Sequence, residues 1–171
     1  MIYINAFKKA SRALRKLITE ESQLSLFYDR KYQYRGNTFF NIVPKTVTVL
    51  DNWANLQLRK YEAEMRLYVR KEGYGEHTHM HFMQQLSERI NRLLKNNPSP
   101  ANIDGATWST YYTRLGHSVD YWNLVTAYTM HNLTLDEMTY DPPKTDSESP
   151  IPGLHIVQYD LSFELLEQDY E

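Results

Sequence analysis

The sequence predicts an α+β fold, in which a mainly antiparallel sheet carries two amphipathic helices on one face, in a single domain over residues 1–171. Residues 61–70 alternate apolar and polar side chains, the period of a strand covered on one face. Residues 82–94 repeat apolar side chains every three to four positions, which is the period of a helix with one buried stripe. A helix laid on one face of an antiparallel sheet satisfies both patterns.

The first predicted element is an amphipathic helix that begins after Asn5. One side carries apolar residues and the other carries cations. A charged outer face is usually only solvated, although it also suits an acidic neighbouring subunit or nucleic acid. The apolar stripe consists of Phe7, Ala10, Leu14, Leu17 and Ile18, and the basic face of Lys8, Lys9, Arg12, Arg15 and Lys16.

A β-hairpin is predicted next. After a mixed aromatic segment at residues 24–34 and a turn at residues 35–37, residues 38–50 are rich in β-branched and aromatic side chains. Pro44 lies inside this region, so we expect an edge strand or two short strands. Asp51-Asn52 is the predicted turn, followed by a long strand at residues 56–70.

The second half of the chain mixes clear and ambiguous patterns. A loop at residues 71–76 leads into the second helix, which should begin near His77 or Thr78 and end near Asn96, before Asn-Asn-Pro-Ser-Pro. Residues 105–114 and 121–133 are candidate strands, and the second of these also fits a helical period. The polar, proline-rich residues 141–153 predict a long exposed loop or arm, and residues 155–165 alternate as a closing strand before an acidic tail.

Composition excludes several kinds of site. The chain has no cysteine, which removes disulfides, thiolate nucleophiles and cysteine-based zinc sites. A net charge of −2 argues against a surface that is basic throughout, so any contact with a polyanion would be local. No apolar run reaches the roughly 20 residues that cross a bilayer, and we expect a soluble protein that is not secreted.

The sequence offers little catalytic chemistry. Gly73-Tyr-Gly75 lacks the Gly-Lys-Ser/Thr ending of a phosphate loop, and no Gly-x-Ser-x-Gly nucleophile elbow is present. His77, His79 and His81 could gather a divalent ion on one face of an extended segment, but helical geometry would turn successive imidazoles about 200° apart. We therefore predict that the protein is not an enzyme and has no cofactor or metal, with a histidine metal site as the least favoured alternative.

Cations and aromatic residues are combined at two places, the first helix and residues 30–35. Binders of single-stranded nucleic acid use this mixture for phosphate contact and base stacking. Subunit interfaces are also enriched in Tyr and Arg, and we favour this second interpretation.

The order of the predicted elements resembles that of the tail terminator, or tail completion, proteins of long-tailed bacteriophages and related minor tail proteins. The first helix at residues 7–18, the long strand at 56–70, the second helix at 80–94 and the closing strand at 157–166 carry the resemblance. Residues 24–34 depart from this pattern, as does the long region 105–153.

The resemblance implies a virion structural protein of the tail or neck, present in the host cytoplasm during assembly. Six copies would form a ring that caps the tail tube, stops its growth and joins the tail to the head. Expected partners are further copies of the chain, the tail tube protein and the head–tail connector or adaptor, with DNA in the lumen as a non-specific contact and no membrane. The candidate interface residues are Lys8, Arg12, Arg15, Lys16, Arg30, Tyr32, Tyr34, Arg35, Asp141, Pro142, Pro143 and Lys144.

One alternative belongs to another functional class. A small nucleic-acid-binding accessory protein would use the basic first helix together with residues 30–35. It predicts a salt-dependent affinity for DNA that is lost when the cations of the first helix are neutralised.

Overall fold

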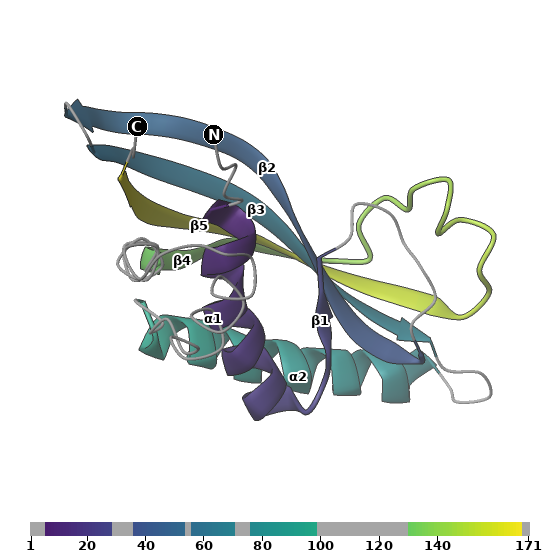
Figure 1. Cartoon of the computed structure of the whole chain (residues 1–171). Coiled ribbons are helices and arrows are strands. Elements are labelled where there is room, and N and C mark those ends of the chain that lie inside the picture. Colours follow the sequence, from purple (N-terminus) through teal and green to yellow (C-terminus); the bar gives the residue numbers. More distant parts are fainter. Residues whose placement is uncertain (1–5, 29–35, 54–55, 71–75, 99–129, 169–171) are drawn as a thin grey trace, which may run out of the picture.

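The computed structural model of the chain, drawn in Figure 1, describes residues 6–28, 36–53, 56–70, 76–98 and 130–168. Two helices and five strands follow one another within these residues. In chain order they are α1 (Ala6–Ser22), β1 (Leu26–Phe27), β2 (Thr38–Trp53), β3 (Leu56–Arg70), α2 (Glu76–Asn96), β4 (Met130–Tyr140) and β5 (Leu154–Gln168).

The strands form one mixed sheet in the order β1-β2-β3-β5-β4. β2 pairs with β3, β3 with β5 and β5 with β4, and all three pairings are antiparallel. β1 is parallel to β2 and pairs with it only at Phe40 and Asn41. Figure 1 shows α1 and α2 on the same side of this sheet. The α+β class predicted from the two sequence periods is confirmed.

α1 forms where the sequence predicts the first amphipathic helix. Phe7, Leu14 and Ile18 belong to its apolar stripe and are buried in the core. The Ser22 hydroxyl donates to the carbonyl of Ile18, four residues earlier, as the helix ends. Gln23 then has a φ of 59°, the left-handed conformation in which many helices terminate.

β2 and β3 form the predicted hairpin, and β3 has the predicted bounds. The predicted turn at Asp51-Asn52 is wrong, because both residues continue β2 and pair with Leu58 and Gln57. β2 ends only at Trp53. Cross-strand pairing with β3 therefore outweighs the local turn preference of Asp-Asn, and a register shift after Val49 accommodates it.

Pro44 lies inside one continuous β2, so the alternative of two short strands is wrong. The register with β3 shifts directly after Pro44, which pairs with Ala63. Among the described strands, β2 has β3 as its only neighbour over this stretch, since β1 pairs only at Phe40 and Asn41. The missing N–H of Pro44 can therefore face away from the sheet, as the edge-strand prediction requires.

α2 begins at Glu76, one residue before its predicted start, and ends at the predicted Asn96. Its buried side chains repeat every three to four positions. Asn97 closes the helix, because its side-chain amide donates to the carbonyl of Leu93. The buried residues of α2 include Met83, Leu86, Ile90 and Leu94.

The last two strands differ in how well the sequence predicts them. β5 contains the whole predicted closing strand. β4 begins near the end of the candidate strand 121–133 and extends seven residues beyond it, to Tyr140. The pattern of β4 is harder to recognise because its register with β5 shifts twice, after His131 and after Leu135. Residues 105–114 and 121–129 lie outside the described part of the chain.

Apolar side chains gather on both faces of the sheet. The larger cluster fills the space between the helices and the sheet and includes Met65, Tyr159 and Phe163. A smaller cluster on the opposite face contains Phe39, Tyr68, Leu154 and Ile156, against which Ile151 packs. The second cluster exists because residues 141–153 fold back over one end of that face. β5 is therefore covered on both faces where it begins, and on the helix face alone further along.

Candidate functional site

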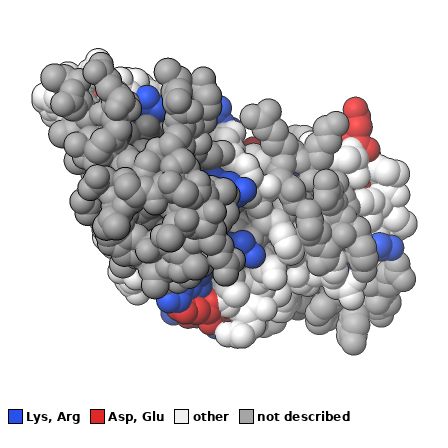
Figure 2. Space-filling model, viewed as in Figure 1, with Lys and Arg blue, Asp and Glu red and all other residues white. Residues whose placement is uncertain are grey.

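Three of the predicted interface cations line a single cleft. Lys8, Arg12 and Arg15 are four and three residues apart, so they form one stripe along α1. The cleft lies between this stripe and β1 and has a volume of about 100 Å³. Figure 2 shows lysine and arginine side chains in the central part of this face, where Figure 1 draws α1 and β1. The cleft is lined by Lys8, Ser11, Arg12, Arg15, Leu26, Phe27, Tyr28 and Ile42.

The fourth predicted cation of α1 lies apart from this cleft. Lys16 pairs with Glu20 at 3.8 Å, one helical turn further along. The neighbouring Glu21 pairs with Arg89 of α2 at 3.0 Å. The carboxylates at the end of α1 are thus engaged by other cations, and the positive charge around the cleft comes from the first part of the helix.

A second surface lies on the far end of the β2–β3 hairpin, which extends past both helices in Figure 1. Val47, Val49, Leu50 and Trp53 are each about half exposed there, at 47%, 51%, 47% and 49%. We call these four residues the hairpin patch. Val47 pairs with Tyr61, whose ring is buried on the helix side of the sheet. Val47 and Val49, which pairs with Arg59, thus continue the helix side of the sheet beyond the helices, whereas Trp53 pairs with Leu56 on the other face and Leu50 lies at a register shift.

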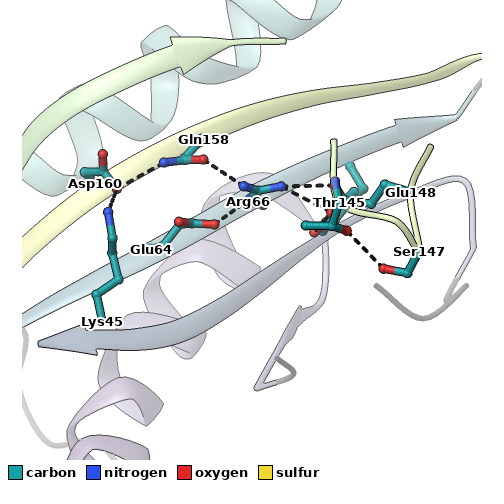
Figure 3. A network of polar contacts seen from close by, with 9 residues as sticks. Lys45, Glu64, Arg66, Thr145, Ser147, Glu148, Gln158 and Asp160 are labelled. Atoms are coloured by element: carbon teal, nitrogen blue, oxygen red, sulfur yellow. Dashed lines mark hydrogen bonds and ion pairs between the residues drawn. The ribbon is translucent and has the colours of Figure 1, made fainter. Parts of the chain in front are cut away.

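The predicted arm, residues 141–153, connects β4 and β5 and is anchored to the sheet by Glu148. Figure 3 shows this carboxylate among side chains from β3 and from the segment itself. Glu148 accepts hydrogen bonds from the Tyr68 hydroxyl at 2.7 Å, from the Thr145 amide at 2.8 Å and from Arg66 at 3.1 Å. Only 1% of Glu148 is exposed. Pro142 is also buried, whereas Asp141, Pro143 and Lys144 are exposed.

The anchor belongs to a longer network on the face opposite the helices. Arg66 also donates to Glu64 and, at 3.0 Å, to Gln158. Gln158 donates in turn to Asp160, which is paired with Lys45 at 3.1 Å (Figure 3). The network joins β2, β3, β5 and residues 141–153, and so it holds that segment in place against three strands.

The pKa values of two side chains on this face, Tyr68 and Lys45, are raised. Burial, together with the hydrogen bond to Glu148, raises the pKa of Tyr68 well above its ordinary value. The hydrogen bond to Asp160 raises the pKa of Lys45, against an opposing effect of burial. Both shifts favour the protonated forms, which are the forms that donate these hydrogen bonds.

The histidines of the predicted metal cluster lie on a helix. His77, His79 and His81 all fall within α2, so the extended segment that would favour a metal site is not formed there. In the described part of the chain, no three histidine, aspartate or glutamate side chains are placed to hold a metal ion. His155 lies 3.8 Å from Asp141, and His131 is exposed on β4.

Sequence reasoning placed some site residues and missed others. Arg30, Tyr32, Tyr34 and Arg35 lie outside the described residues. Glu148 was missed because nothing in a polar, proline-rich segment distinguishes a buried carboxylate from exposed ones. The hairpin patch had a signal, because Val47, Val49 and Leu50 place apolar side chains on both parities of an edge strand.

Comparisons with known proteins do not identify a relative, so the functional inference rests on this geometry. No family model matches the chain, and a search of curated proteins finds no significant match. Within the described residues, no helix combines the length and the apolar character that a membrane crossing needs.

Proposed function

We propose that the protein is a virion structural subunit, a tail terminator or head–tail joining protein of a long-tailed bacteriophage, which acts as a ring, of six copies by the family pattern. The hairpin patch carries this proposal. Four large apolar side chains, each about half exposed, lie along one protruding hairpin, and Val47 and Val49 share its helix side. Such a patch is typical of a surface that a partner covers.

The function we propose is geometric, and it requires several distinct contact surfaces on one subunit. The hairpin patch offers an apolar one and the α1–β1 cleft a basic one. The face opposite the helices offers a polar one, and there residues 141–153 are fixed by Glu148 rather than hanging free. A ring subunit would use these for its neighbours, the last ring of the tail tube and the connector.

The hairpin patch can be tested with charges placed on opposite faces of one strand. Val47→Asp/Val49→Asp should stay folded, because both positions are about half exposed, and should lose assembly. Thr46→Lys/Thr48→Asp is the control, since these residues pair with Glu62 and Lys60 on the other face and each new charge there meets an opposite one. Light scattering over a concentration range, with and without tail tubes, gives the readout. If the unchanged chain stays a monomer and does not bind tube ends, the proposal is refuted.

A second candidate function, a nucleic-acid-binding accessory protein, is favoured by one observation. Lys8, Arg12 and Arg15 converge with the half-exposed Tyr28 on one cleft, which combines phosphate-binding cations with an aromatic ring. DNA affinity measured at several salt concentrations distinguishes the two candidates. A steep salt dependence that is lost in Lys8→Gln/Arg12→Gln/Arg15→Gln favours nucleic acid, and its absence favours the structural role.

A further inference from the structure

We infer that the α1–β1 cleft receives the acidic β4 edge of a second copy of this chain, so that copies join head to tail. The inference rests on the proposed ring function and specifies which surfaces meet. The cleft holds Lys8, Arg12 and Arg15, and the exposed acids of β4 are Asp136 and Glu137. The two surfaces belong to opposite ends of the strand order β1-β2-β3-β5-β4.

The cleft suits carboxylate side chains in size and in chemistry. Its volume of about 100 Å³ equals that of about three water molecules, enough for one or two side-chain tips and too small for a helix. Three cations surround it, and Tyr28 adds a hydroxyl group that can donate a hydrogen bond to a carboxylate. Apolar walls from Leu26, Phe27 and Ile42 reduce the solvation of an ion pair formed there.

The β4 edge is the acidic surface that complements this cleft. Residues 130–143 contain three acids and neither lysine nor arginine. Asp136 accepts hydrogen bonds from the hydroxyls of Thr134 at 2.9 Å and Ser162 at 3.2 Å, which fix its carboxylate while leaving it exposed. Within the described part of the chain, neither Asp136 nor Glu137 pairs with a lysine or arginine. Other acids do: Glu20, Glu21, Glu64 and Glu148 each have a cation.

The pairing of strands adds a reason for a cation from outside. Glu137 lies directly opposite Asp160 in the β4–β5 register. Like charges directly opposite one another in a sheet are unfavourable. Asp160 has Lys45 as a partner, on the side of β2, whereas Glu137, among the residues that the structure describes, accepts a hydrogen bond from the Thr139 hydroxyl at 3.4 Å and has no cation. A cation from a neighbouring copy would relieve the repulsion at this position.

The placement of the two surfaces determines the kind of assembly. In a head-to-tail contact, a pair leaves one cleft and one β4 edge unfilled, so further copies add, and they form a ring when the rotation between copies closes. A head-to-tail contact through these charges is thus the kind of contact that a ring requires.

Neutral variants of the full chain test the contact. We expect Arg12→Gln/Arg15→Gln and Asp136→Asn/Glu137→Gln each to lose assembly in sedimentation velocity. Their equimolar mixture should form one-to-one pairs and nothing larger, since one intact cleft meets one intact edge. Glu88→Gln/Lys95→Gln, on the exposed side of α2, is the matched control and should assemble like the unchanged chain. Unaltered assembly of both test variants would overturn the inference.

Cross-linking keeps the test decisive if the unchanged chain is a monomer in dilute solution. The chain has no cysteine, so Ser25→Cys beside the cleft and Thr134→Cys beside Asp136 are unique sites for a bismaleimide linker. A mixture of the two should give a heterodimer that salt suppresses. A yield no higher than that of Ser25→Cys mixed with Ser147→Cys would overturn the inference.

Three outcomes separate this inference from its alternatives. If single-stranded DNA binds the unchanged chain, Arg12→Gln/Arg15→Gln abolishes binding and the heterodimer is absent, the cleft is a nucleic-acid site and the inference falls. If the head-to-tail contact forms but the ring ignores tail tubes, the contact stands and the proposed tail function fails. If the protein caps tail tubes but the heterodimer cross-link does not form, the proposed tail function stands and the head-to-tail contact is overturned.

Discussion

The Tyr68 hydroxyl donates a 2.7 Å hydrogen bond to Glu148, a residue 80 positions later in the chain. Tyr68 lies on β3, the central strand of the sheet, and Glu148 lies in the segment that connects β4 to β5. Tyr68 also stacks on Phe39, with ring centroids 5.2 Å apart. This contact closes a small second core on the face that the helices leave open, and it gives residues 141–153 a fixed position.

Removing the Glu148 carboxylate should destabilise the fold strongly. Glu148→Ala leaves Arg66 without one of its two carboxylates and Tyr68 without its acceptor, in a site where Glu148 is 1% exposed. Breaking a buried ion pair from one side costs about 3–5 kcal/mol. Urea unfolding measures the loss. Asp146→Ala, at an exposed position of the same segment, is the control and should change stability by less than about 0.5 kcal/mol.

The two ends of the polar network should differ in their contribution to stability. The Lys45 side chain is 45% exposed in its pair with Asp160, whereas that of Arg66 is 14% exposed. Lys45→Ala should therefore cost at most about 1 kcal/mol, and Arg66→Ala about 3–5 kcal/mol because Glu148 is left buried and unpaired. Equal losses of stability for the two variants in urea unfolding would contradict the conclusion that the Arg66–Glu148 pair holds the segment in place.

A buried hydrogen bond joins α2 to the sheet. The hydroxyls of Ser87 and Tyr159 lie 2.8 Å apart, and both residues are fully buried. Ser87→Ala or Tyr159→Phe leaves one hydroxyl without its partner and should cost about 1–3 kcal/mol. The double variant removes both polar groups, so it should lose less than the sum of the two single losses. A double-mutant cycle by thermal or urea unfolding measures this coupling, and strict additivity would show that the bond does not form.

Alkaline pH should unfold the protein through its buried tyrosines. Burial raises the pKa of Tyr68 and of Tyr159 above the ordinary value of 10.0. Above that value the unfolded chain releases these protons and the folded chain keeps them. Stability is thus complete below about pH 10 and falls above it, by about 1.4 kcal/mol per pH unit for each tyrosine. Tyr68→Phe and Tyr159→Phe should each flatten the decline measured by urea unfolding; an unchanged slope would contradict the prediction.

The sequence alone determined the elements whose patterns are local and regular. The alternation in β3 and the three-to-four-residue stripes of α1 and α2 follow from which side chains must face one covered surface. Helical spacing also predicts that Lys8, Arg12 and Arg15 lie in one stripe, because residues three and four apart are neighbours on a helix. β4 escaped this reasoning because two register shifts break its alternation.

Tertiary structure decided whatever depends on residues distant in the chain. β2 continues through Asp51-Asn52 because these residues pair with β3. The local turn preference of Asp-Asn carries no information about that pairing. The burial of Glu148 requires Arg66 and Tyr68, which no local pattern connects to it. Val47 and Val49 are exposed on the helix side because the hairpin extends past the helices. Local periodicity fixes which side of an element is apolar, and only the packed chain decides what covers it.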